Sequence, residues 1–345
     1  MKPILGITIG DPAGIGPEVA LKALDKESIY SSSIPILIGD ALPILKTAKI
    51  LGIPEANLIE IAKPEDAKGL YGTIEYIKLG ILKEDYEVGK VSKNTGEAAF
   101  CYVTKAIELA LENKIAAIVT APINKEAIHL AGHNFPGHTE ILAHYCNVED
   151  FAMVLVSGNL RVIHVTTHVS MKEMCETLSE ERVYETIKLA FEAQRSMALT
   201  GKIAVAALNP HASENSLFGD EEAKYIKPAI NRAASEGLDI EGPIPADTVF
   251  AKALGGSYSM VVAMYHDQGH IPVKLAGFKF DEKTGTFSEV GGINCTIGLP
   301  IIRTSVDHGT AFDLAGKGIA NEQSMIDAIE LAATMAEKRE IVYED

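Results

Sequence analysis

Residues 259–274, SMVVAMYHDQGHIPVK, decide the fold predicted for this chain. The apolar run 260–264 is rich in valine and stops abruptly at the polar residues 265–269. A short run of this kind predicts a buried strand of a parallel sheet, with the polar cluster at its carboxyl end. Open α/β sheets bind their ligands at that edge. The sequence therefore predicts an α/β protein with a functional site beyond this strand.

Apolar runs also precede three histidines, His168, His211 and His266. A single histidine after a strand is usually a hydrogen-bonded structural residue. Three in the same position can converge on one cation if their strands are neighbours, and they would leave coordination positions open, as catalytic sites do. Nitrogen ligands favour zinc, cobalt, manganese or nickel over calcium. The residues alone leave both interpretations open, a structural role and a metal site.

Composition excludes several classes of function. The 345 residues suggest about two domains, and the net charge at pH 7 is −16. No basic field is available to neutralise phosphate backbones, so we expect no nucleic-acid or membrane partner. No apolar stretch is long enough for a transmembrane span, and the N-terminus does not resemble a signal peptide. The four cysteines are dispersed, which is typical of reduced thiols, so we expect a cytoplasmic enzyme.

Three further positions give weaker signals. The loop 10–18, GDPAGIGPE, precedes an expected helix whose free amides attract anions, although a tight connection explains it equally well. His138 or Thr139 can bind an anion at the start of another helix, where an ordinary N-cap is the more common explanation. Asp247 is expected to cap a helix over 248–254, and a catalytic base is the less common alternative.

Strands and helices alternate along the chain. We expect strands at 3–9, 34–38, 57–61, 73–79 and 116–120, a hairpin of 153–156 with 160–166, and helices at 41–51, 94–113, 180–198, 220–235 and about 321–338. We expect residues 278–292 to be irregular, with a turn at 281–285.

At these motifs the chain resembles the 4-hydroxythreonine-4-phosphate dehydrogenase family over essentially its whole length. The matching segments are 10–18, 120–125, 137–140, 166–168, 209–211, 245–248, 265–269 and 294–315. More distantly, GDPAGIGPE and HGTAFDLAGKGIAN are similar to loops of isopropylmalate and isocitrate dehydrogenases. The resemblance implies two α/β/α domains with a cleft between them. One would combine about 1–125 with 268–345 and bind the coenzyme, and the other, about 126–267, would bind the metal and dimerise.

The resemblance also implies which residues form the site. It implies a divalent metal (zinc, cobalt, manganese or magnesium) shared between both subunits of a homodimer, and NAD as the coenzyme. The implied metal ligands are His168, His211 and His266, the substrate contacts are His138, Thr139, Lys274, Asn294 and Arg303, and the coenzyme contacts are Gly309, Thr310, Asp313 and Asn321. A carboxylate at Asp313 would bind the ribose hydroxyls and repel a 2′-phosphate, which favours NAD over NADP.

The implied activity is the NAD- and metal-dependent oxidative decarboxylation of a four-carbon 3-hydroxy-acid 4-phosphate. A secondary hydroxyl is oxidised, and the resulting β-keto acid loses carbon dioxide. We choose Asp247 as the base that removes the hydroxyl proton. The substrate is 4-hydroxythreonine 4-phosphate, as in pyridoxal phosphate biosynthesis, or threonate 4-phosphate from sugar-acid breakdown. The stretch between Lys274 and Asn294 is longer than we expect for the first branch and resembles the second.

Two other classes of protein are alternatives. A phosphate acyltransferase of similar fold would need neither NAD nor three histidines, and a regulatory protein could bind NAD or metal without turnover. The presence of all three histidines and of Asp313 disfavours both.

Overall fold

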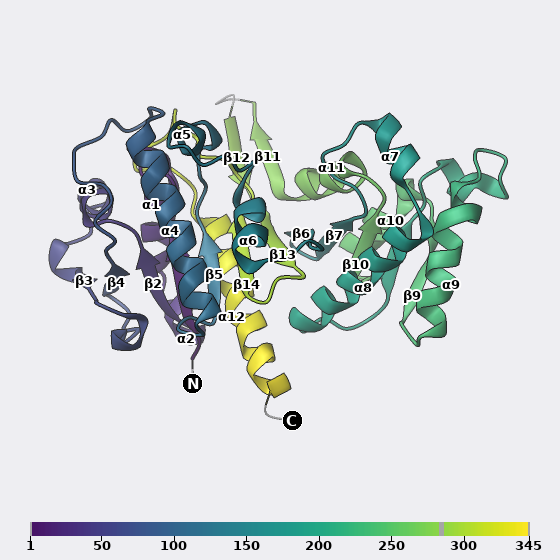
Figure 1. Ribbon diagram of the computed structural model, residues 1–345, viewed down its shortest axis with the longest axis horizontal. Coiled ribbons are helices and arrows are strands. Elements are labelled where there is room, and N and C mark those ends of the chain that lie inside the picture. The colour runs from purple at the N-terminus through teal and green to yellow at the C-terminus, as the bar shows by residue number, and fades with distance from the viewer. Residues whose placement is uncertain (1, 283–285, 344–345) are drawn as a thin grey trace. The chain divides into compact units, whose positions relative to one another are not determined.

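The computed structural model describes residues 2–282 and 286–343. The chain divides into two compact units, which we call unit 1 (Met1–Glu149 and Leu299–Asp345) and unit 2 (Asp150–Gly298). The sequence placed the corresponding boundaries near residues 125 and 267. Which unit binds coenzyme and which binds metal stays a prediction. Figure 1 traces the chain and labels its elements.

Unit 1 contains a parallel sheet in the order β3-β4-β2-β1-β5-β14. Its strands are β1 (Ile4–Thr8), β2 (Ile34–Ile38), β3 (Leu58–Glu60), β4 (Ile74–Ile77), β5 (Ala117–Thr120) and β14 (Ile302–Val306). Its helices are α1 (Gly16–Leu24), α2 (Glu27–Ser32), α3 (Ala41–Leu51), α4 (Lys93–Leu111), α5 (Lys125–Leu130), α6 (His138–Cys146) and α12 (Gln323–Tyr343). Helix α4 lies alongside β5, as Figure 1 shows. Every residue of β4 and β5 is buried, as expected for strands covered on both faces.

Unit 2 contains a mixed sheet in the order β13-β6-β7-β10-β8-β9. Its strands are β6 (Ala152–Ser157), β7 (Leu160–His164), β8 (Ile203–Ala206), β9 (Ile240–Ile244), β10 (Met260–Ala263) and β13 (Ile293–Ile297). Its α-helices are α7 (Met171–Thr177), α8 (Glu180–Ser196), α9 (Lys227–Ser235), α10 (Ala246–Leu254) and α11 (His266–Gly277). Strands β6 and β7 form the expected antiparallel hairpin, and β7, β10, β8 and β9 run parallel. The α/β prediction is confirmed.

Two local predictions were wrong, and a third, the helix over 220–235, was right except for the helix type of its first turns. Instead of an irregular stretch, β11 (Phe278–Asp281) and β12 (Thr286–Val290) form an antiparallel pair, and residues 283–285 of the expected turn lie outside the described residues. The helix expected from 220 begins as a π-helix over Glu222–Ile226. Asp247 does not cap α10, because Pro245 holds the N-cap position and Asp247 lies inside the first turn.

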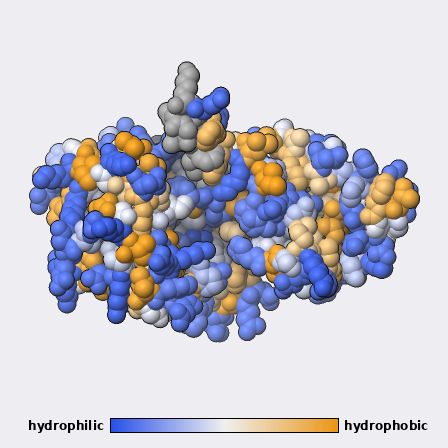
Figure 2. Space-filling model, turned by 90° about the horizontal axis from the view of Figure 1, so that it is seen from above, coloured by the Kyte–Doolittle hydropathy of each residue, from blue (hydrophilic) through white to orange (hydrophobic). Residues whose placement is uncertain are grey.

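Within residues 2–282 and 286–343, no helix has the length and hydropathy needed to cross a membrane. Hydrophilic residues are interspersed with apolar ones on the face seen in Figure 2. The apolar core of unit 2 lies on the strands that precede the three histidines, with Val162, Ala206 and Val261 in one buried cluster. The core thus fixes the strands whose ends carry the candidate site.

Candidate active site

The three strands that precede the candidate metal ligands are neighbours. Strand β10 lies between β7 and β8, and it pairs in parallel with both. Their carboxyl ends therefore point to the same edge of the sheet. His168 follows β7, His211 follows β8, and His266 begins α11 directly after β10. The three strands are therefore neighbours, which is the condition under which their histidines could converge on one cation.

His168 and His266 lie close together at this edge. Their ring centroids are 5.7 Å apart, and both line a pocket of about 300 Å³ together with Thr166, Thr167 and Asp267. Nδ1 of His266 lies 2.7 Å from a carboxylate oxygen of Asp267. A carboxylate on one ring nitrogen orients an imidazole and leaves the other, here Nε2, for a cation. The arrangement fits a divalent cation that prefers nitrogen ligands.

Two further histidines, which the sequence did not single out, pack behind His266. The ring of His270 stacks on that of His266 at 3.6 Å, and His164 lies 4.7 Å from His270. Burial, reinforced by His270 and His266, lowers the pKa of His164 to about 3, so its ring is neutral at neutral pH. A Cβ at Gly269 would lie 2.2 Å from Nε2 of His164, so glycine is required there. The sequence signal was the spacing of His266 and His270, one helical turn apart.

His211 lies on an unusual turn. Residues 211–216 all have positive φ although none is glycine: His211, Ala212, Ser213, Glu214, Asn215 and Ser216. The left-handed conformation costs such residues about 1 kcal/mol or more each, so surrounding contacts must hold it. The buried carboxylate of Glu222 does so at the start of the turn, where it accepts hydrogen bonds from the backbone of Leu208 and Asn209 and from the Asn209 side chain.

The turn directs His211 toward Phe218, with ring centroids 6.3 Å apart. Among the described residues of the chain, no group of three or more His, Cys, Asp or Glu side chains is arranged to hold a metal ion. The pocket lined by His168 and His266 thus has two of the predicted ligands, and the complete set stays a prediction.

In unit 1, His138 and Thr139 begin α6, and Arg303 lies on β14. Arg303 is only 3% exposed and donates hydrogen bonds from Nε and Nη2 to Oγ1 of Thr120, at 3.2 and 2.8 Å. Burial lowers the pKa of His138 well below its usual range, and the positive charges of Arg303 and Lys125 lower it further. Nε2 of His138 is buried and has no hydrogen-bond partner in the part of the chain that the structure describes.

These residues form a site suited to an anion. Two cations lie near a neutral imidazole, and the first backbone amides of α6 add positive potential. Lys125 was not among the predicted site residues, although it lies in the matching segment 120–125 at the end of β5. Its proximity to His138 comes from the packing of α4 against both α5 and α6, which no local pattern reveals.

The remaining predicted residues lie at separate places. In unit 2, Lys274 is on α11 with Nζ 4.5 Å from the ring centroid of Phe278, Asn294 is on β13, and Asp247 is exposed on α10. In unit 1, Gly309, Thr310 and Asp313 follow β14. The side-chain oxygen of Asn321 accepts a hydrogen bond from the backbone nitrogen of Gln323, the first residue of α12. Their contacts with substrate or coenzyme stay predictions.

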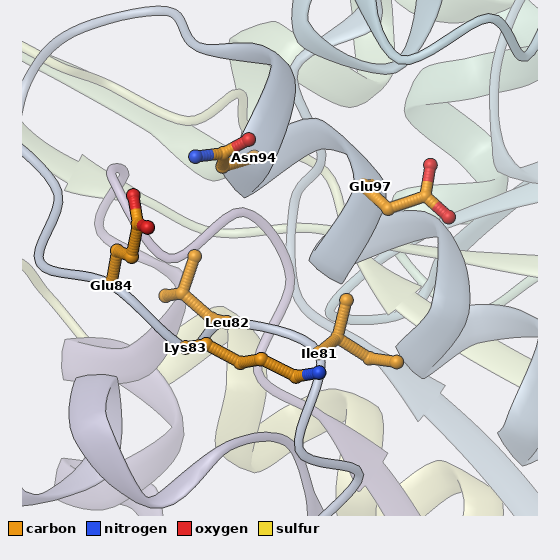
Figure 3. A pocket seen from close by; sticks show the side chains of 6 residues that line it. All are labelled: Ile81, Leu82, Lys83, Glu84, Asn94 and Glu97. Atoms are coloured by element: carbon orange, nitrogen blue, oxygen red, sulfur yellow. The ribbon is translucent and has the colours of Figure 1, made fainter.

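Another pocket in unit 1 has a different character. It measures about 300 Å³ and is lined by Ile81, Leu82, Lys83, Glu84, Asn94 and Glu97. Figure 3 shows its charged and apolar side chains in close proximity. Its lining carries charges of both signs, unlike the cationic surroundings of His138. Glu97 is hydrogen-bonded to Nε2 of His133 at 2.8 Å. It includes none of the predicted site residues.

Comparison with known proteins identifies the family. Residues 31–332 match the family described as pyridoxal phosphate biosynthetic protein PdxA. The chain belongs to the PdxA family. This membership confirms the resemblance inferred from the motifs, and with it the prediction of a dehydrogenase.

Members of the PdxA family with assigned names are similar over nearly their whole length. The D-threonate 4-phosphate dehydrogenase of Salmonella typhimurium is 47% identical over 96% of this chain and 98% of its own length. The enzyme of the same name from Cupriavidus necator is 45% identical over 98% of both chains. The crystal structure of a 4-hydroxythreonine-4-phosphate dehydrogenase from Burkholderia phymatum is 44% identical, covers 97% of this chain and 98% of that chain, and has a TM-score of 0.83.

In this PdxA-family chain, the loop before α1 contains a buried carboxylate, Asp11. Oδ1 of Asp11 accepts a hydrogen bond from Ala13 N, whereas Oδ2 is buried without a partner among the described residues. Burial raises the pKa of Asp11 to about 6, against the opposing effect of the hydrogen bond from Ala13. The carboxyl group of Asp11 therefore binds its proton more tightly in the folded protein than in the unfolded chain.

We predict that Asp11→Asn changes the pH dependence of stability. Because the native carboxyl has the raised pKa, its contribution to the free energy of unfolding falls as pH rises from about 4 to 6, by roughly 3 kcal/mol in total. The Asn variant lacks this fall. Urea unfolding at several pH values, with the exposed Asp66→Asn as control, measures it. If the free energy of unfolding depends on pH in the same way in the wild type and in Asp11→Asn, the raised pKa of Asp11 is contradicted.

Proposed function

We propose that this protein oxidises and decarboxylates D-threonate 4-phosphate with NAD and a divalent metal ion. The observation that carries the proposal is the similarity, over 96% and 98% of the chain, to the two D-threonate 4-phosphate dehydrogenases. A second candidate substrate is 4-hydroxythreonine 4-phosphate, which the name of the Burkholderia protein favours. The two acids differ only in a hydroxyl or an amine on one carbon.

The cations near His138 support a doubly anionic substrate. The positive charges of Arg303 and Lys125 both lower the pKa of His138. Such cations bind phosphate or carboxylate by charge-assisted hydrogen bonds. His138 is neutral at neutral pH, so its buried Nε2 can accept a hydrogen bond from a substrate hydroxyl. Lys274 and Asn294 are proposed as further substrate contacts, and Thr139 as a hydroxyl donor at the start of α6.

For the metal, His168 and His266 are the proposed ligands from one subunit, with His211 from a second copy. Their imidazoles are suited to zinc, cobalt or manganese, and magnesium is the alternative predicted from the family. The pairing of two copies is supported by apolar side chains exposed close to these ligands in sequence. Ile271 and Leu275 on α11 are 63% and 82% exposed, and Leu217 after the His211 turn is 70% exposed. Such side chains favour burial against a partner.

The proposed reaction balances without another reactant. NAD, when bound, accepts the hydride from C3, and the cation polarises the oxygens of the substrate. The hydroxyl proton goes to a base, for which Asp247 is our proposal. The bond between C2 and the carboxylate then breaks, and C2 takes up a proton. The products are NADH, carbon dioxide and dihydroxyacetone phosphate.

The position of Asp247 is compatible with this role. It is exposed in the first turn of α10, and α10 packs against the turn Pro210–Glu214 that carries His211. A second copy that supplies His211 would therefore bring Asp247 with it. Binding of NAD by Gly309, Thr310 and Asp313, and the expected cleft between two domains, stay predictions.

We predict a higher kcat/KM for D-threonate 4-phosphate than for 4-hydroxythreonine 4-phosphate. The measurement is NADH formation with each acid at matched metal and NAD concentrations, together with enzymatic detection of dihydroxyacetone phosphate. A chelator should abolish turnover, and added metal should restore it. A higher kcat/KM for the amino acid would assign the second candidate instead. No turnover of either acid, despite bound NAD and metal, would contradict both.

We predict that Lys125→Met raises KM for the phosphorylated substrate about tenfold, because one charge-assisted contact with the anion is lost. The dissociation constant for NAD should stay unchanged. Lys105→Met, on the exposed side of α4, serves as the control for loss of a surface cation. An unchanged KM in Lys125→Met would remove this residue from the substrate site.

A further inference from the structure

Helix α1 holds residues 318–320, which lie near the end of the stretch from Gly309 to Asn321 that contains the predicted coenzyme contacts. The carboxylate of Glu18 is 2% exposed and accepts hydrogen bonds from the backbone nitrogens of Gly318 and Ala320, at 3.1 and 2.6 Å. Nζ of Lys22 donates to the carbonyl oxygen of Ala320 at 2.7 Å and also pairs with Glu18. One turn further along the chain, Lys26 pairs with Glu322 at 3.1 Å.

Glu18 and Lys22 are spaced by four on α1, so they lie on one face of this helix. Glu18 binds residues 318 and 320, and Lys22 binds 320. Lys26 lies beyond the end of α1, in extended backbone, and pairs with Glu322. The contacts with Ala320 satisfy both its amide and its carbonyl group.

The loop before α1 holds the other end of the same segment. The backbone nitrogen of Ile15 donates to the carbonyl oxygen of Thr310 at 2.9 Å. Gly14 allows this approach, because a Cβ there would lie 2.9 Å from both Cβ and the carbonyl oxygen of Thr310. Asp313, the predicted ribose contact, thus lies between two anchored points.

We propose that Glu18 is a positioning residue for the coenzyme, acting through the backbone of residues 318–320. The inference rests on the proposed use of NAD, and it assigns to the GDPAGIGPE motif a role in shaping the coenzyme segment. A carboxylate can accept from both backbone donors at once, whereas a glutamine at this position has only one acceptor oxygen. Its amide NH2 group would face the second backbone N–H, so two hydrogen-bond donors would oppose each other. The ion pair between Glu18 and Lys22 would also be lost.

The test is Glu18→Gln in the full-length protein, read by two methods. Hydrogen exchange without NAD should be faster for the amides of Gly318 and Ala320, because these donate directly to the carboxylate. Calorimetric titration should show a rise in the dissociation constant for NAD of about tenfold. The dissociation constant of the phosphorylated substrate should not change. Glu27→Gln, on exposed α2, is the matched control and should leave both measurements as in wild type.

The outcomes separate this inference from the proposed function. The positioning role would be overturned if the amides of residues 318 and 320 exchange in Glu18→Gln at the wild-type rate. It would also be overturned if they exchange faster while the affinity for NAD stays the same. Equal loss of substrate and NAD affinity would also overturn it, since that indicates a general loss of structure. Failure of the wild type to bind NAD would overturn the proposed function, while exchange still decides whether Glu18 holds the segment. If Glu18→Gln does not fold, Lys22→Met removes the contact of α1 with the carbonyl oxygen of Ala320, and the dissociation constant for NAD is then the readout that decides.

Discussion

The hydrogen bonding of β10 to β7 is the constraint on which the two proposed metal ligands of one chain, His168 and His266, depend. These strands are distant in sequence, yet their parallel pairing sends their carboxyl ends to one edge of the sheet. The buried apolar residues of the strands stabilise that arrangement, because every residue of β8 and β10 is buried and moving a strand out of the sheet would expose them to water. The positions of His168 and His266 are consequences of core packing rather than of local sequence.

Around this edge, supporting residues hold the predicted ligands in place. Glu222 fixes the entry to the left-handed turn of His211, and Asp267 and His270 orient His266. In unit 1, Thr120 holds the guanidinium of Arg303, and Glu18 holds the backbone near Ala320. Glu222, Asp267, Thr120 and Glu18 each supply an oxygen that hydrogen-bonds a predicted site residue or the backbone of its segment, which is the requirement for a preorganised site.

Much of the fold follows from the sequence, because strong local signals agree with the tertiary structure. The expected bounds of β2 and α3 match those observed, and α8 begins where Ser179 supplies the N-cap. The pair β11 and β12 was missed because its pattern has no clear buried face, and Phe280 is 61% exposed. The turn 211–216 contains no glycine that could have signalled its left-handed backbone. Lys125 and His164 were missed because only tertiary packing brings them to the site residues.

The central claim is that a complete metal site needs His168 and His266 from one chain and His211 from another. The most direct measurement mixes inactive variants and follows metal content and turnover in the reassembled protein. Mixing His168→Ala with His211→Ala should restore about a quarter of the wild-type activity, because mixed dimers then contain one intact site. Mixing His168→Ala with His266→Ala should restore none. If neither mixture regains metal and turnover, the metal site shared between two chains is contradicted.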